Sequence, residues 1–100
     1  MAIYDIQYSA EAEEDIRYFK KYEQRIILAG IEDQLRHQPT LVTANRFRRE
    51  PPDIGEWELR IGIFRVYYTI NTSVHIVHVE RIGEKPNNEI YFRGKRSGQL

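Results

Sequence analysis

Hydrophobic and polar residues alternate along residues 56–70, which read EWELRIGIFRVYYTI. Every second side chain is apolar in two adjacent runs: Trp57, Leu59 and Ile61, then Phe64, Val66, Tyr68 and Ile70. A period of two predicts two antiparallel strands, joined tightly at Gly62, with one face on a core and the other in water. Arg65 and Tyr67 share the predicted wet face, where a strand would hold the arginine rigidly enough to recognise an anion.

Two helices are predicted between a first strand at residues 3–8 and Pro39. Ser9 is a good N-cap for a helix over residues 10–20, whose first turns carry acidic residues that suit the positive end of the helix dipole: Glu11, Glu13, Glu14 and Asp15. Its apolar stripe consists of Ala12, Ile16 and Phe19. A second helix is predicted over residues 23–38, with a stripe of Leu28, Ile31 and Leu35 widened by Ile27 and Ala29. The pair forms an antiparallel hairpin that a sheet must cover.

The remaining chain predicts a long loop and further strands. Residues 40–55 form the loop, which carries Pro51, Pro52 and a basic cluster of Arg46, Arg48 and Arg49. Residues 74–82 are apolar on both faces and predict an interior strand, which a turn at residues 83–88 ends. A last short strand is predicted at residues 89–93, followed by a frayed basic tail.

This order of elements, β-α-α-β-β-β(-β), predicts an α+β fold with a helical hairpin packed on a mostly antiparallel sheet. One hundred residues suffice for one modest core. We therefore expect a single domain at residues 1–93 and a basic C-terminal tail at residues 94–100.

Charge is unevenly distributed along the chain, although its net value is zero. Residues 1–45 carry 5 Lys and Arg against 8 Asp and Glu, whereas residues 46–100 carry 10 against 7. An acidic helical half followed by a basic strand half predicts one positive face.

Several classes of protein are not expected from this sequence. The absence of cysteine excludes disulfides and thiolate chemistry, and fits a reducing cytoplasm. The sequence lacks an apolar run long enough for a membrane span and a basic-then-apolar signal, so we expect a cytoplasmic protein with no membrane partner. His37, His75 and His78 are not placed to converge, so neither a metal nor another cofactor is expected. Gly62 and Gly83 are interpreted as turn residues rather than parts of a phosphate loop.

The candidate chemistry rests on Arg65, Lys85 and Tyr91, together with the basic loop cluster. Cleavage of RNA needs cations at the scissile phosphate and groups that move protons to and from the ribose oxygens. Arginine can fork onto two phosphate oxygens, and tyrosine can stack on a base or move a proton. The structural alternative is that Arg65 pairs with Glu56 or Glu58 across the hairpin and that Tyr91 only packs.

Four stretches resemble the RelE/ParE superfamily of bacterial type II toxins, and together they cover nearly the whole chain. They are IQYSAEAEEDI, NRFRRE, EWELRIGIFRVYYTI and VHIVHVERIGEKPNNEIYFRG. The third is similar to the family hallmark W-x-L-R-x-G-x-[FY]-R-V-x-Y, and the fourth to its last strand, Gly-Lys/Arg turn and terminal tyrosine. The fold that this resemblance implies has the same order of elements as the hydrophobic pattern predicts.

The resemblance implies a small toxin held in a hetero-oligomer by a cognate antitoxin. RelE-like relatives are mRNA endoribonucleases that cleave at the ribosome, inhibit translation and arrest growth. ParE-like relatives inhibit DNA gyrase and lack the nuclease residues. A third alternative is a non-toxic module that only binds the antitoxin.

Individual positions carry the implied roles. Arg65 matches the arginine that contacts the phosphate, Lys85 stands where an arginine is common, and Tyr91 matches a tyrosine that some nucleases use near the scissile bond. Arg46, Arg48 and Arg49 are expected to hold the RNA backbone, and Glu50 is the candidate general base. The chain departs from the type member at Glu56 and Glu58, where that protein has two lysines.

Overall fold

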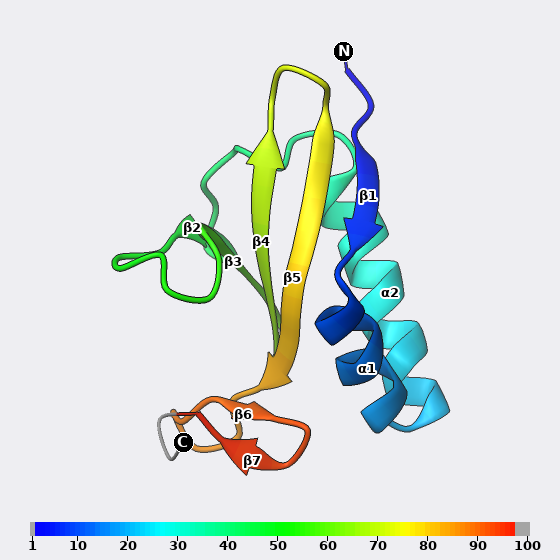
Figure 1. Cartoon of the computed structure of the whole chain (residues 1–100), viewed down its shortest axis with the longest axis vertical. Helices are drawn as coiled ribbons and strands as arrows, with labels where there is room; N and C mark the ends of the chain where they lie inside the picture. Colours follow the sequence, from blue (N-terminus) through cyan, green and yellow to red (C-terminus); the bar gives the residue numbers. More distant parts are fainter. Residues whose placement is uncertain (1, 98–100) are drawn as a thin grey trace.

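The computed structural model describes residues 2–97 as two helices packed on one face of a sheet (Figure 1). The helices are α1 (Ala10–Tyr18) and α2 (Lys21–Leu35). The strands are β1 (Asp5–Tyr8), β2 (Arg46–Arg48), β3 (Trp57–Ile61), β4 (Phe64–Asn71), β5 (Ile76–Glu84), β6 (Tyr91–Phe92) and β7 (Lys95–Arg96). Antiparallel pairs link β2 to β7 in chain order, and β1 pairs with β5 in parallel. The predicted α+β fold, with a helical hairpin on a mostly antiparallel sheet, is confirmed.

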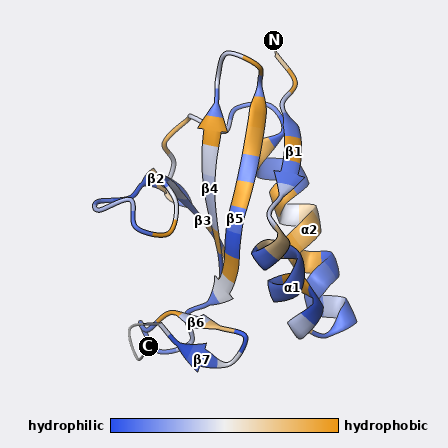
Figure 2. Ribbon diagram, viewed as in Figure 1, coloured by the Kyte–Doolittle hydropathy of each residue, from blue (hydrophilic) through white to orange (hydrophobic). Residues whose placement is uncertain are grey.

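The core lies between the helices and the face of the sheet that they cover. Burial of the alternating apolar residues on β3 and β4 confirms the predicted pattern, since Leu59, Val66 and Tyr68 are completely buried. On the helices the buried residues are Ala12, Phe19, Ile27, Ile31 and Leu35. Figure 2 shows hydrophobic residues in α2, β4 and β5.

The helix boundaries differ slightly from the prediction. Ser9 caps α1 as expected, because its hydroxyl accepts a hydrogen bond from the Ala12 amide at 3.0 Å. The second helix begins two residues earlier than predicted, at Lys21, because the Glu23 carboxylate accepts from the Lys20 amide at 3.0 Å and fixes the first turn. It ends at Leu35, before Pro39.

The apolar stripe of α2 is also shifted from the predicted one. Ile27, Ile31 and Leu35 are buried at a spacing of four, whereas Leu28 is 37% exposed and Ala29 lies on the surface. The apolar stripe of α2 that packs on the sheet is therefore narrower than the sequence pattern indicates.

Three predicted irregular segments belong to the sheet. Residues 46–48 of the predicted loop form β2, because their backbone pairs with β3. Gly83 lies inside β5 instead of in a turn. The hairpin of β6 and β7 orders residues 91–96, and the Ser97 amide donates to the Ile90 carbonyl at 2.8 Å, so the predicted fraying is wrong for residues 94–97. Residues 98–100 lie outside the described part of the chain.

Gly83 is required by the close approach of β6. A Cβ atom at this position would lie 2.6 Å from the Tyr91 carbonyl oxygen and 2.9 Å from two ring carbons of Phe92. Gly83→Ala is therefore expected to lower the free energy of unfolding by about 1–3 kcal/mol, measured by urea unfolding, because the backbone of β6 must move.

Gly30→Ala is the matched control for that substitution. Its Cβ would also meet an atom at 2.6 Å, but this atom is Cδ1 of Ile61, the end of a flexible side chain. Alanine also favours the helix by about 1 kcal/mol, so we expect a change within about 1 kcal/mol. Equal losses in both variants would contradict the close-approach explanation for Gly83.

Candidate nucleic-acid interface

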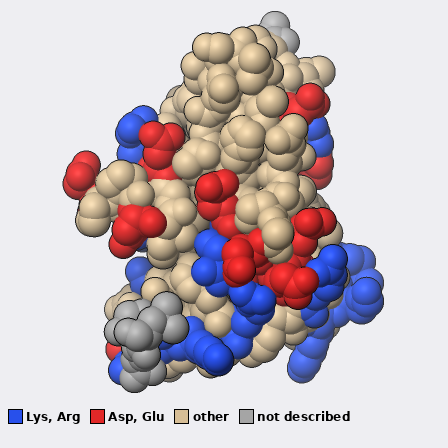
Figure 3. All heavy atoms as spheres, viewed as in Figure 1, with Lys and Arg blue, Asp and Glu red and all other residues tan. Residues whose placement is uncertain are grey.

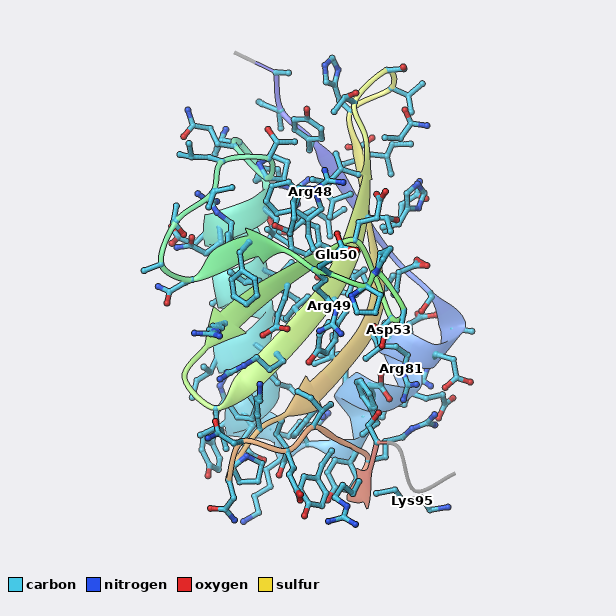
Figure 4. The ribbon with its side chains drawn as sticks, turned by 90° about the vertical axis from the view of Figure 1, so that its left-hand side faces the viewer. Arg48, Arg49, Glu50, Asp53, Arg81 and Lys95 are labelled. Atoms are coloured by element: carbon cyan, nitrogen blue, oxygen red, sulfur yellow. The ribbon has the colours of Figure 1, made fainter. Side chains whose placement is uncertain are left out.

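The face of the sheet opposite the helices carries charged and aromatic side chains, and Figure 4 looks onto it. Alternation along each strand places directly paired residues on the same face. Glu58 pairs with both Phe47 and Tyr67, and Tyr67 pairs in turn with Arg81. Arg65 lies between Arg60 and Gly83 on the same basis. We call this surface the helix-free face.

Glu58 occupies the centre of the helix-free face and binds three arginines. Its carboxylate lies 2.9 Å from an Arg49 amino nitrogen, 3.4 Å from Arg65 Nε and 3.7 Å from Arg60 Nε. Glu58 is only 4% exposed. The pairing of Arg65 with Glu58, which the sequence left open as an alternative, is therefore observed, and three cations share one buried anion.

The centre of the sheet face that was predicted to be solvent-exposed is buried. Tyr67 is completely buried, and the Arg65 side chain retains 12% of its exposure. The reason is a row of arginines lying over aromatic rings: Arg60 over Phe47 at 4.7 Å, Arg49 over Tyr67 at 4.9 Å and Arg81 over Phe92 at 4.1 Å. Burial, with a smaller effect from Glu58, raises the pKa of Tyr67, so its hydroxyl stays protonated.

The guanidinium of Arg65 is also fixed by the turn beside it. One of its amino nitrogens donates to the carbonyl oxygens of Gly62 at 2.7 Å and Phe64 at 2.9 Å. Gly62 supplies the tight turn with a φ of 58°, as the sequence predicted. The hairpin that carries the hallmark motif thus holds its arginine in a single orientation.

Asp15 joins the helices to this face, which the sequence did not predict. Its carboxylate is completely buried and accepts from Arg81 Nε at 2.8 Å and from the Ile82 amide at 2.9 Å. Arg93 Nε lies 3.1 Å from the same carboxylate. Because β1 pairs with β5 only as far as Val79, Asp15 replaces the strand acceptor that the Ile82 amide lacks.

A cavity of about 630 Å³ adjoins the helix-free face at its β6–β7 end. Its lining includes four cations and no acidic residue: Ile54, Arg81, Phe92, Arg93, Lys95, Arg96 and Ser97. A second cavity of about 450 Å³ shares Ile54, Arg96 and Ser97 with it and extends to Arg49 and Asp53. Figure 3 shows the Lys and Arg side chains gathered over this lower part of the molecule. We call the first cavity the basic cavity.

The structure brings two of the three predicted catalytic residues to the same face. The Lys85 amide donates to the Ile63 carbonyl at 2.8 Å and so continues the β4–β5 ladder, which places Lys85 on the face of Arg65. Tyr91 pairs with Glu84, which pairs with Phe64, and therefore lies on the helix side of the sheet. Phe92 takes the position beside the arginines instead, so Tyr91 does not join Arg65.

The predicted basic loop cluster is divided between the two faces. Arg46 is buried and donates to the Gln34 carbonyl at the end of α2, and Arg48 lies over the Trp57 ring at 5.6 Å. Both therefore belong to the helix side, and Arg49 alone of the three reaches the helix-free face, because β2 alternates like any strand. Glu50 is exposed and lies far from Lys95 (Figure 4).

Residues 2–97 form neither a cluster of metal ligands nor a membrane-spanning helix. Within residues 2–97, no group of three His, Asp or Glu side chains converges as metal ligands would. Neither described helix combines the length and apolar character that crossing a bilayer demands.

The solved structures that resemble this one include chains of two toxin–antitoxin complexes. A chain of the RelBE2 toxin–antitoxin complex from Mycobacterium tuberculosis matches with a TM-score of 0.72 and 21% identity, over 87% of this chain and 97% of that one. A chain of the archaeal RelE–RelB complex from Pyrococcus horikoshii OT3 matches with a TM-score of 0.61 and 15% identity, over 85% and 98%. No protein-family model and no curated protein matches the sequence. The chain thus has the RelE-type fold that its sequence motifs imply.

Proposed function

We propose that this chain is the toxin of a toxin–antitoxin pair and that it cleaves mRNA at the ribosome. The observation that carries this proposal is the position of Arg65 and Arg49 around Glu58, next to the basic cavity. Guanidinium groups held by a buried carboxylate and by aromatic rings are preorganised for phosphate. The fold of two toxin–antitoxin complexes supports the class of protein.

The reaction needs few groups from the protein. The RNA 2′-hydroxyl loses its proton to solvent water as it attacks the adjacent phosphorus, the bond to the 5′-oxygen breaks, and that oxygen takes up a proton. A 2′,3′-cyclic phosphate and a 5′-hydroxyl result. Arg65 would stabilise the negative charge that develops on the phosphate oxygens, with Arg49 beside it. Lys85, on the same face, would protonate the departing 5′-oxygen. Because the RNA supplies its own nucleophile, the reaction requires neither a metal ion nor another cofactor.

The partner that we propose is an antitoxin with an acidic segment. The two similar structures are complexes of a toxin with its antitoxin. A carboxylate-rich segment lying across the basic cavity would pair with Lys95, would compete with Glu11 and Glu89 for Arg93 and Arg96, and would keep RNA from the helix-free face.

A gyrase inhibitor without nuclease activity is the second candidate. One observation favours it: Glu58 lies 3.4 Å from Arg65 and partly neutralises the arginine that would bind phosphate. The position of Tyr91 on the helix side also removes a proton donor from the helix-free face.

Inducible expression without an antitoxin separates the two candidates. We expect growth arrest with discrete new mRNA 5′ ends inside translated frames. Arrest with intact mRNA and inhibited DNA supercoiling would replace the ribonuclease by the gyrase inhibitor. Unimpaired growth would indicate that the chain is a non-toxic module that only binds an antitoxin.

A further inference from the structure

Arg81 is the most completely fixed cation at the edge of the basic cavity. Its Nε and one amino nitrogen donate to Asp15 at 2.8 and 3.1 Å, and its guanidinium lies over the Phe92 ring at 4.1 Å. Phe92 is in turn held edge-on by Tyr67, with ring centroids 5.8 Å apart, and packs against Gly83. One edge and one face of the guanidinium plane are therefore occupied.

The rest of the Arg81 guanidinium is available to a ligand. The side chain keeps 26% of its exposure and lines the basic cavity. The buried Asp15 carboxylate offsets much of the Arg81 charge, and its hydrogen bond raises the pKa of the guanidinium. The free face of such a flat, permanently protonated group can stack on a planar ring.

The other walls of the basic cavity match the remaining parts of a nucleotide. Ile54, from the loop after β2, provides an apolar wall. Lys95 and Arg96 lie on β7, and within the described chain Lys95 has no acidic partner within 4 Å. One amino nitrogen of Arg96 donates to both carboxylate oxygens of Glu89 at 3.2 Å, and the Arg96 side chain keeps 39% of its exposure. These side chains can bind the backbone phosphates on either side of a ring placed on Arg81.

We propose that the basic cavity is a subsite for one unpaired RNA base, which stacks on the Arg81 guanidinium while Lys95 and Arg96 bind the flanking phosphates. This inference rests on the proposed action on RNA, and it adds a base-binding subsite beside the site of cleavage. Asp15 and Phe92 are positioning residues in this arrangement, because they hold the plane of Arg81 without touching the base.

Binding of an uncleavable RNA tests this subsite separately from catalysis. The probe is a fully 2′-O-methylated hexanucleotide, which lacks the nucleophile, together with six versions that each carry one abasic position. For the wild-type protein, we expect loss of one particular base to weaken binding about tenfold. Arg81→Lys, which keeps the charge but loses the plane, should weaken binding of the intact probe to the same extent and remove the penalty for the abasic position.

Two further variants keep the test decisive if Arg81→Lys does not fold. Ile54→Ala leaves the bonds of Arg81 in place and should weaken binding of the intact probe about threefold, with a smaller penalty at the same abasic position. Lys95→Ala should weaken binding of all probes equally and reduce the slope of log K against log salt by about 1.

Other results overturn the subsite. Equal binding of all probes by the wild type, or an unchanged abasic penalty in both Arg81→Lys and Ile54→Ala, would show that the base does not stack there. Absence of RNA binding together with new mRNA 5′ ends in cells would refute the subsite but not the nuclease. Base-dependent binding without mRNA cleavage would refute the nuclease and keep the subsite.

Discussion

Arg65→Gln is expected to lower the rate of mRNA cleavage by about 10²- to 10³-fold, the usual effect of removing one group that stabilises transition-state charge. Glutamine keeps a hydrogen-bond donor in place of the guanidinium that binds the turn carbonyls, but it carries no charge to place on the phosphate. The measurement is the rate at which new mRNA 5′ ends appear after induction without antitoxin.

Arg25→Gln is the matched control, because Arg25 is exposed on α2, on the opposite side of the sheet. It should cleave at the wild-type rate. Thermal unfolding shows whether Arg65→Gln remains folded after Glu58 loses one of its three cations. A folded Arg65→Gln protein with wild-type cleavage would remove Arg65 from the proposed reaction.

Asp15→Asn is expected to lower the free energy of unfolding by about 3 kcal/mol. The substitution removes the buried anion that binds Arg81, Arg93 and the Ile82 amide. Arg93 keeps its pair with Glu11, whereas Arg81 and the Ile82 amide lose their charged acceptor. This loss lies at the low end of the range observed when one partner of a buried ion pair is removed, because both arginines are partly exposed. Urea unfolding followed by circular dichroism measures the change.

Glu14→Gln provides the comparison one residue away on the same helix. Glu14 pairs with Arg17 at 2.7 Å, but both side chains are more than half exposed. An exposed pair contributes about 0–1 kcal/mol, so the control should unfold almost like the wild type. If both variants lose the same stability, the link between α1 and β5 does not depend on the Asp15 charge.

The fold could be predicted from the sequence wherever one face of an element is apolar. The alternation that ends at Ile70 specified β3 and β4, and the double-sided apolar run specified β5 as an interior strand. The three-residue strand β2 could not be predicted, because its pairing depends on β3 and its own sequence, RFR, is too short for a period. Its position decides which of Arg46, Arg48 and Arg49 reach the helix-free face.

The candidate site was only partly predictable, because residue type does not show how a charge is paired. Glu58 and Arg65 are polar by type, yet mutual pairing and stacking bury them. One signal for Asp15 was present: it lies between Ala12 and Phe19 at helical spacing, and an acid on an apolar stripe needs a buried partner. Phe92, and not Tyr91, lies on the helix-free face because of the strand register. A shift of one residue along a strand moves a side chain to the other face of the sheet.

The parallel pairing of β1 with β5 makes folding a late event in the synthesis of this chain. Asp5 pairs with Ile76, and Asp15 accepts a hydrogen bond from the amide of Ile82. Both contacts therefore need residues that are translated about seventy positions later. Contacts of such long sequence separation form slowly and only after the intervening chain has left the ribosome. A nascent chain that stops before β5 lacks both the central strand of the sheet and Arg81, and so cannot assemble the helix-free face.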